Sequence, residues 1–314
     1  MKISIIIPCM NEEGNVSGLY NKISETLKNK KYEIIYIDDG SKDKTMEKLH
    51  EIYNKDNLHV KVLSFSRNFK KEAAMLAGLE HATGDYTCII DGDLQQNPSY
   101  LLDMINFLDE NPDYDEVAMV MDDRSLYSGL MAFCKKSFYK LIDKLSDVHF
   151  ENGASDFRMF RTNVRDAIIS LSEKNRFSKG IFAWIGFKVK YMPYKVEPRT
   201  SGKSSFGFIS SFQYAFEGIL AFSTKPLTYA IKCGVLTLLA AFIYLIVLLV
   251  QVFAFDMTFN SIYALILLLL VLFGIQFIIL GIIGMYFSKA YTEIKGRPVY
   301  IIKEKLGFNE ETIL

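Results

Sequence analysis

The sequence predicts an α/β domain with a mainly parallel sheet, followed by two helices that span a membrane. From residue 3 to residue 90, short apolar runs alternate with amphipathic stretches, the pattern of strands joined by crossover helices. Residues 233–255 and 261–287 contain no Asp, Glu, Lys or Arg, although the whole chain is 23% charged. At about 1.5 Å per residue, each run is long enough to cross a hydrocarbon core of about 30 Å.

The soluble elements follow from these runs in order. The predicted strands are residues 3–7, 33–37, 60–65, 86–90 and 116–120. The predicted helices are residues 14–27, 44–53, 70–81 and 98–110, with a long amphipathic segment at 126–145. Because a helix separates each of the first four strands from the next, these strands should run parallel. Ligands of such sheets collect at the carboxyl ends of the strands.

The elements nearest the membrane allow two readings. Residues 206–222 are rich in aromatic side chains at helical spacing, so this helix either lies in the membrane interface or packs on the soluble domain. The connection at 256–260 holds one acid and no base, whereas basic residues precede the first span and follow the second. This asymmetry predicts that both termini face the cytoplasm. Two core helices of a large soluble protein are a weaker reading, since such helices rarely lack every charge.

Polar clusters follow the predicted strands, and the one after the fourth strand suggests a metal site. Asp91, Asp93 and Gln95 offer hard oxygen ligands, which Mg²⁺ and Mn²⁺ prefer. Such an ion neutralises charge on a departing diphosphate. Asp-x-Asp alone is a weak motif that also occurs in ordinary acidic turns. Its place at the end of a buried strand favours function.

Other motifs narrow the class of protein. Asp39 can cap the following turn, and it can also accept hydrogen bonds from a nucleotide base or ribose. The sequence has neither Gly-x-Gly-x-x-Gly nor a P-loop, which disfavours dinucleotide oxidoreductases and P-loop nucleotidases. Zero net charge gives no sign of a nucleic-acid partner, and the four scattered cysteines indicate neither zinc nor disulfides. Residues 176–180 and 199–203 are basic segments that suit either anionic lipid or a bound phosphate, and the phosphate reading is favoured for Arg199 and Lys203.

Several segments together resemble a known family. They are residues 5–13 (IIIPCMNEE), 35–45 (IYIDDGSKDKT), 66–84 (SRNFKKEAAMLAGLEHATG) and 91–95 (DGDLQ). These segments resemble family 2 glycosyltransferases of the GT-A fold, in the polyisoprenyl-phosphate branch that includes dolichol-phosphate mannose synthase. Residues 153–158, 175–187 and 217–224, followed by two spans, look like bacterial members that transfer glucose or N-acetylglucosamine to undecaprenyl phosphate (bactoprenol).

The resemblance implies roles for individual residues. Pro8, Glu12, Asp39 and Asp91 would bind the nucleotide sugar. Asp91, Asp93 and Gln95 would hold Mg²⁺ or Mn²⁺, and Asp156 together with Asp93 would be catalytic. Arg124, Arg199 and Lys203 would bind the acceptor phosphate. The chain departs from its relatives at two positions, where Met121 replaces a frequent arginine and Lys70 replaces the glycine usual before Lys71.

The resulting expectation is an inverting, metal-dependent glycosyltransferase of the bacterial cytoplasmic membrane, using a UDP-sugar and undecaprenyl phosphate. Residues 1–204 would be the cytoplasmic GT-A domain, 205–230 juxtamembrane helices, 231–288 the membrane hairpin and 289–314 a cytoplasmic tail. A homo-oligomer is left open. Two alternatives remain: a processive polysaccharide synthase, for which the Gln-x-x-Arg-Trp motif is missing, and a non-catalytic nucleotide-binding scaffold.

Overall fold

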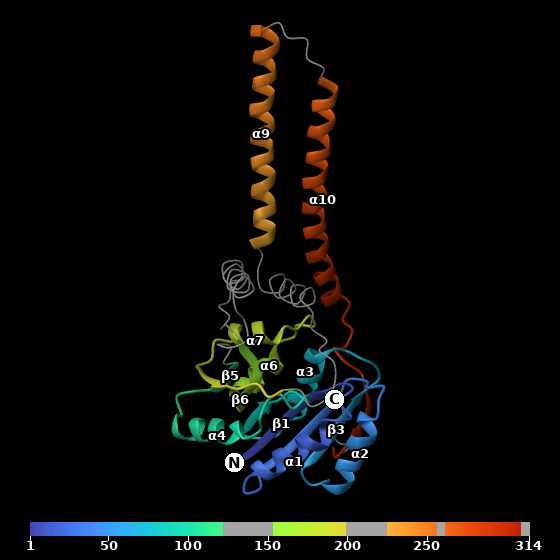
Figure 1. Cartoon of the computed structure of the whole chain (residues 1–314), viewed down its shortest axis with the longest axis vertical. Helices are drawn as coiled ribbons and strands as arrows, with labels where there is room; N and C mark the ends of the chain where they lie inside the picture. The colour runs from blue at the N-terminus through green and yellow to red at the C-terminus, as the bar shows by residue number, and fades with distance from the viewer. Residues whose placement is uncertain (122–152, 199–224, 256–260, 309–314) are drawn as a thin grey trace.

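The structure is a computed structural model that describes residues 1–121, 153–198, 225–255 and 261–308. These residues form a mixed α/β domain from which two long helices extend (Figure 1). The described strands make one eight-stranded sheet in the order β7-β5-β6-β4-β1-β2-β3-β8.

The elements have the following bounds. The strands are β1 (Lys2–Cys9), β2 (Lys31–Asp38), β3 (Val60–Phe65), β4 (Tyr86–Ile89), β5 (Glu116–Met121), β6 (Ala154–Arg161), β7 (Val189–Tyr194) and β8 (Ile302–Leu306). The helices are α1 (Val16–Thr26), α2 (Thr45–Lys55), α3 (Lys71–His81), α4 (Tyr100–Glu110), α6 (Thr162–Ser170), α7 (Ser178–Trp184), α9 (Lys225–Phe255) and α10 (Ser261–Ile294).

The predicted parallel half of the sheet is confirmed. β1 pairs in parallel with both β2 and β4, and β2 pairs in parallel with β3. Side chains alternate along β1, so Ile3, Ile5 and Ile7 enter one core while Ile6 enters the other. A sheet covered on both faces needs such strands, because each face must bury an apolar surface.

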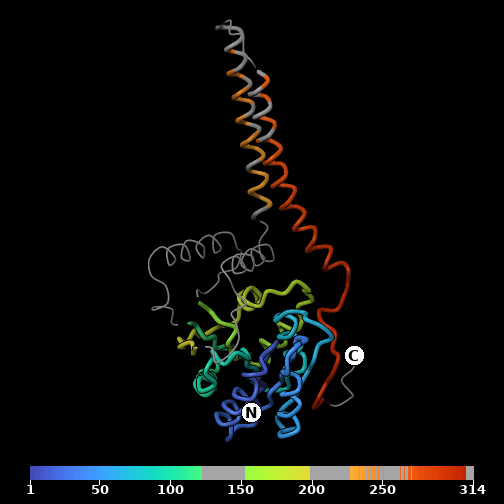
Figure 2. The backbone as a smooth tube through the Cα atoms, turned by 45° about the vertical axis from the view of Figure 1, so that its right-hand side comes forward, coloured from blue at the N-terminus to red at the C-terminus, as the bar shows by residue number. Residues whose placement is uncertain are grey.

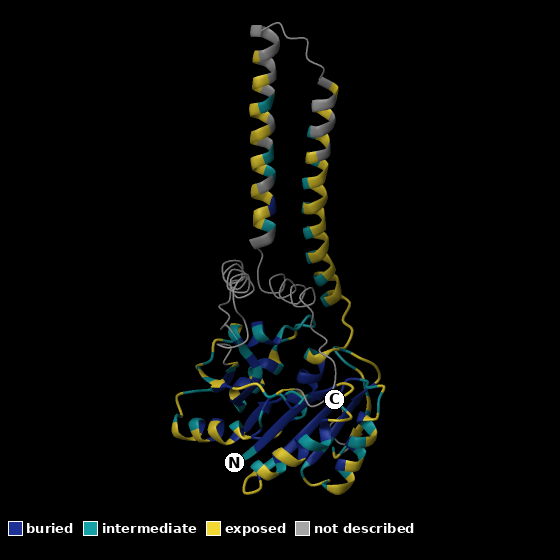
Figure 3. Cartoon of the chain, viewed as in Figure 1, coloured by how far each residue is buried: buried dark blue, intermediate teal, exposed yellow. Residues whose placement is uncertain are grey.

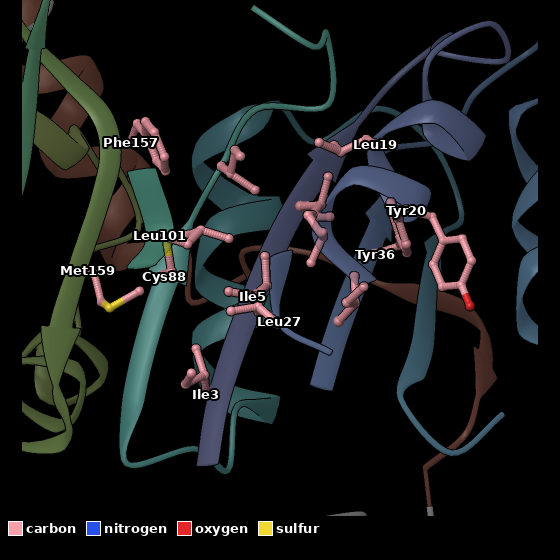
Figure 4. Packing of buried hydrophobic residues seen from close by; sticks show 14 of the residues in the cluster. Ile3, Ile5, Leu19, Tyr20, Leu27, Tyr36, Cys88, Leu101, Phe157 and Met159 are labelled. Carbon is pink, nitrogen blue, oxygen red and sulfur yellow. The ribbon is translucent and has the colours of Figure 1, made fainter. Parts of the chain in front are cut away.

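Helices cover the two faces in separate layers. α1, α2 and α4 pack on one face, where Leu19, Leu27 and Leu101 meet β1, β2 and β4 (Figure 4). α3, α6 and α7 pack on the other. α3 approaches β1 closely at Gly78, since a Cβ there would collide with Ile6 and contact Ile37. This close approach fixes the distance between α3 and the sheet. Lys71, at the start of α3, is part of the site described below.

Three strands were not predicted. β6 runs antiparallel between β4 and β5, and its sequence includes Asp156, Arg158 and Arg161, which obscure the apolar pattern. β7 adds to β5 in parallel. β8 follows both long helices in the chain, yet it pairs antiparallel with β3 at the far edge of the sheet. The segment after the second long helix is therefore built into the sheet.

α9 and α10 lie side by side and extend away from the domain (Figure 2). Two stretches, Leu227–Tyr244 and Val271–Ile294, are long and apolar enough to cross a membrane, and 7% and 0% of them are buried. Large apolar side chains such as Phe277 and Phe287 are about 70% exposed, whereas the central strands of the sheet are buried (Figure 3). Such a surface needs an apolar environment, so the chain is membrane-associated. The segments 126–145, 206–222 and 256–260 lie outside the described residues.

Candidate active site

The loops that follow β1 and β2 are joined by hydrogen bonds at the carboxyl edge of the sheet. The Asp39 amide donates to the Cys9 carbonyl at 2.9 Å, and the Asn11 amide donates to Ser41 Oγ at 2.9 Å. The Glu12 amide donates to Thr45 Oγ1 at 2.8 Å. Pro8 lies within β1 beside Ile37 of β2. Four predicted nucleotide-site residues therefore lie at or just after the carboxyl ends of neighbouring strands. They are Pro8 and Glu12 at β1, Asp39 after β2 and Asp91 after β4.

Asp39 links this edge to the loop after β3. Its Oδ1 accepts the Phe69 amide at 2.6 Å. Burial raises the pKa of Asp39, although the backbone amides of Phe69 and Lys70 oppose the rise. Gly40 follows with φ of +70°, and a Cβ there would lie 2.6 Å from the Arg67 carbonyl carbon. Glycine at this position lets the two loops pack against each other.

Asp91 is fixed from two directions. Its amide donates to Gln96 Oε1, and Gln96 Nε2 donates to Asp91 Oδ2, both at 2.9 Å. Gln96 Nε2 also lies 3.3 Å from Ser155 Oγ, which connects the turn after β4 to β6. The other carboxylate oxygen, Oδ1, is 2.5 Å from the ammonium of Lys71 at the start of α3.

Lys71 joins Asp91 to Asp156. Its Nζ donates to Asp156 Oδ2 at 2.7 Å. Burial alone would raise the pKa of Asp156, but the neighbouring ammonium of Lys71 outweighs it, and the pKa lies well below its ordinary value. The same two carboxylates hold the pKa of Lys71 above its ordinary value against the loss of solvent. Asp156 Oδ1 is buried without a hydrogen-bond partner among the described residues, which marks a place for a donor or a cation.

Asp93 and Gln95 are each hydrogen-bonded to a backbone group in this structure. Asp93 Oδ1 accepts the Gln95 amide at 3.2 Å, and Gln95 Nε2 donates to the Glu197 carbonyl at 3.4 Å. Within the described residues no three His, Cys, Asp or Glu side chains are gathered as a metal would require. By chemistry the donors fit Mg²⁺ or Mn²⁺, because all are hard oxygens. The Asp156 oxygen that has no partner among the described residues belongs to the carboxylate that shares Lys71 with Asp91. The metal assignment of Asp91, Asp93 and Gln95 stays a prediction.

The predicted acceptor residues Arg124, Arg199 and Lys203 lie outside the described residues. Met121 ends β5 with 39% of its surface exposed. In the other basic segment, the Arg176 guanidinium donates to the Leu171 and Ile168 carbonyls at 3.0 and 2.9 Å. These bonds hold the loop after α6, so Arg176 has a structural role.

The part played by Lys71 was not predicted, although the residue lies in the segment 66–84 that resembles the family. Its position carried a signal, because a lysine in the first turn of a helix opposes the helix dipole and needs acidic partners. Gln96 and Ser155 were also missed. Gln96 donates to both Asp91 and Ser155, and its contact with Ser155 depends on β6 lying next to β4, which was not predicted.

Comparisons with known proteins agree with this arrangement. The family described as "Glycosyl transferase family 2" matches residues 4–168. The protein CsbB of Bacillus subtilis is 39% identical over 96% of this chain and 91% of its own length. The "Prophage bactoprenol glucosyl transferase homolog" of Escherichia coli is 37% identical over 96% and 99%. The "Bactoprenol glucosyl transferase" of Shigella phage SfII is 36% identical over 97% and 98%.

Solved structures share the fold at low identity. A mannosyltransferase from Pyrobaculum calidifontis, in complex with GDP-Man and Mn²⁺, has a TM-score of 0.50 and 16% identity, covering 73% of this chain and 64% of its own. Glucosyl-3-phosphoglycerate synthase from Mycobacterium tuberculosis, in complex with Mn²⁺, UDP and phosphoglyceric acid, has a TM-score of 0.50 and 18% identity, covering 70% and 76%. The chain spans less than two thirds of the mannosyltransferase.

Proposed function

This chain belongs to glycosyl transferase family 2 and has a GT-A-like fold. On that basis we propose that it transfers glucose from a UDP-sugar to undecaprenyl phosphate. The observation that carries the proposal is the pair of carboxylates, Asp91 and Asp156, joined by Lys71 at the carboxyl edge of a sheet whose chain continues into two exposed apolar helices. The names of the bactoprenol glucosyl transferase relatives support both the sugar and the lipid acceptor.

Pro8, Glu12, Asp39 and Asp91 bind the nucleotide sugar in this proposal. They lie at or just after the carboxyl ends of β1, β2 and β4, which are neighbours in the sheet. A divalent ion held by Asp91, Asp93 and Gln95 would supply charge stabilisation for the departing UDP. Both fold neighbours described above are in complex with Mn²⁺, which supports the choice of ion.

Asp156 faces the reacting sugar and acceptor in this proposal. A phosphate acceptor carries negative charge already, its second pKa being about 6 if phosphoserine is a guide, so little proton abstraction is needed. Catalysis then depends on aligning the phosphate oxygen with the anomeric carbon, and inversion follows from a single displacement. Arg124, Arg199 and Lys203 hold the acceptor phosphate against the negative charge of the site.

The test is a transfer assay with the purified full chain. UDP- and GDP-sugars are each incubated with undecaprenyl phosphate, and the lipid is identified by mass spectrometry. We expect one hexose on the lipid when the donor is UDP-glucose. Transfer from UDP-N-acetylglucosamine instead would identify N-acetylglucosamine as the sugar. Excess EDTA should stop the reaction and Mg²⁺ or Mn²⁺ should restore it. Asp156→Asn should be inactive. A long polysaccharide, or no sugar on the lipid with any donor, would contradict the proposal.

A further inference from the structure

The end of the second long helix is bonded to the catalytic domain through one acid. Glu293, in the last turn of α10, accepts the Lys174 amide at 3.0 and 3.1 Å and the Asn175 amide at 2.9 Å. Asn175 Nδ2 also donates to Glu293 Oε1 at 3.3 Å and to the Lys289 carbonyl at 3.4 Å. The acceptors come from α10 and the donors come from the loop after α6.

Glu293 is an unusual residue for its position. A carboxylate in the last turn of a helix is repelled by the negative end of the helix dipole, typically by about 0.3 to 1 kcal/mol. Here the repulsion is offset by three donors that lie outside the helix. The placement is explained by the attachment to residues 174 and 175 and not by the helix itself.

The attached loop reaches Glu72, the residue next to the lysine that joins the two carboxylates. We define the strap as residues 174–178. Its far end is Ser178, whose amide donates to Glu72 Oε2 at 3.0 Å and whose hydroxyl donates to the same oxygen. Glu72 follows Lys71, the residue that contacts Asp91 and Asp156. Five residues reach at most about 17 Å when extended, so the strap sets an upper limit on the distance between α10 and the start of α3.

A second attachment keeps the helix on the domain independently. After α10, the Tyr300 ring stacks on Phe65 with centroids 5.0 Å apart, and β8 then pairs with β3. Figure 1 shows the lower end of α10 reaching the domain while α9 ends above it. Loss of the Glu293 contacts should therefore leave the chain assembled and loosen only the position of the helix relative to the strap.

We propose that Glu293 is a positioning residue that sets the height of the catalytic carboxylates above the membrane. The strap limits the distance between the end of α10 and Lys71. Asp156 is thereby held where the phosphate of a membrane lipid can reach it. The inference rests on the proposed function. It predicts a defect confined to acceptors that are embedded in a bilayer, because a short soluble acceptor diffuses into the site without regard to its height.

The test compares Glu293→Ala with Glu293→Gln in lipid nanodiscs. The glutamine keeps an oxygen that accepts the strap amides, whereas the alanine removes it. With embedded undecaprenyl phosphate, Glu293→Ala should raise the acceptor KM or lower kcat about five- to tenfold, the effect of losing a hydrogen bond or two. Glu293→Gln should recover most of the activity. UDP binding, and transfer to a water-soluble two-isoprene phosphate, should stay within about twofold for both variants.

Control variants separate the outcomes. Glu51→Ala removes an exposed acid of α2 that pairs with Lys48, and it should change nothing. If Glu293→Ala weakens transfer to both acceptors equally, or to neither, the positioning role is wrong. If the wild-type protein itself fails to glycosylate the lipid while binding UDP, the proposed function fails instead, so the two failures are distinguishable.

Discussion

Lys71 is the residue on which the carboxylate pair depends. Replacing it with methionine leaves Asp91 and Asp156 without their shared cation, so the two should repel each other. Charge-assisted hydrogen bonds contribute about 1.5 to 3 kcal/mol each, and the 41% exposure of Lys71 favours the lower end. We expect kcat/KM to fall roughly ten- to a hundredfold with embedded and soluble acceptors alike.

Steady-state kinetics of Lys71→Met and Lys71→Arg would check this expectation. Arginine keeps the charge but places it differently, so partial activity should return. Activity of Lys71→Met close to that of the wild type would show that the bridge is dispensable.

Lys70 has a backbone conformation that suits glycine. Its φ is 76° and its ψ is 162°, a region in which a side chain costs about 1 to 3 kcal/mol. Glycine adopts such a positive φ without this cost, which accounts for the glycine that the family resemblance implies before Lys71. We expect Lys70→Gly to raise the thermal unfolding temperature, whereas Lys70→Ala, which keeps a Cβ, should not. Equal unfolding temperatures for the two variants would argue against strain at this residue.

Glu33 makes the free energy of unfolding of the domain depend on pH in the acidic range. Burial would raise its pKa, but hydrogen bonds from Ser4, Lys2, Thr83 and Lys61 lower it from 4.5 to about 2. A lowered pKa stabilises the folded state above the unfolded value, and the stabilisation is lost as pH falls from 4.5 towards 2. The shift corresponds to about 3 kcal/mol.

Denaturant unfolding of Glu33→Gln at several pH values would test this account. The variant should be less stable at pH 7 and should lose less stability below pH 4.5 than the wild type. Glu51→Gln, on the exposed surface, is the matched control. Parallel pH profiles for wild type and Glu33→Gln would exclude Glu33 as the source of acid sensitivity.

At the scale of elements, the sequence predicted what local patterns determine. β1 to β4 and their helices were found because apolar runs such as 3–7 and 33–37 alternate with amphipathic helices. β6 and β8 were missed because charged side chains interrupt their apolar pattern. β8 reads IKEKL, and its two apolar residues pack against different cores, Leu306 against one and Ile302 against the other. The contact between Gln96 and Ser155 was missed because Ser155 lies in β6, which was not predicted.

β8 should be needed for the stability of the sheet. Ending the chain after Pro298 removes β8 and Tyr300, which uncovers the edge of β3 and one face of Phe65. We expect a lower unfolding temperature and aggregation through the exposed edge. Ending the chain after Phe308 should have little effect, since β8 is retained. Unfolding scans of both truncations decide the matter, and similar temperatures would show that β8 contributes little.

At the scale of the whole molecule, the proposed hairpin places both ends of the chain on the cytoplasmic side. Lys225 and Lys232 precede the charge-free run 233–255, and Lys289, Lys295 and Arg297 follow the run 261–287. A topology reporter inserted in the 256–260 connection should be outside, and reporters at either terminus should be inside. Reporters at the two termini on opposite sides would contradict the hairpin.

The return of the chain from α10 to β3 has a consequence for biosynthesis. β3 ends at Phe65 and β8 begins at Ile302, so roughly 240 residues are translated between the two neighbours. At about 5 to 20 residues per second, the edge of β3 waits roughly 10 s or more for its partner, and both apolar helices emerge in that interval. The sheet is therefore completed last. A catalytic domain with its full sheet can exist only after the hairpin has been synthesised.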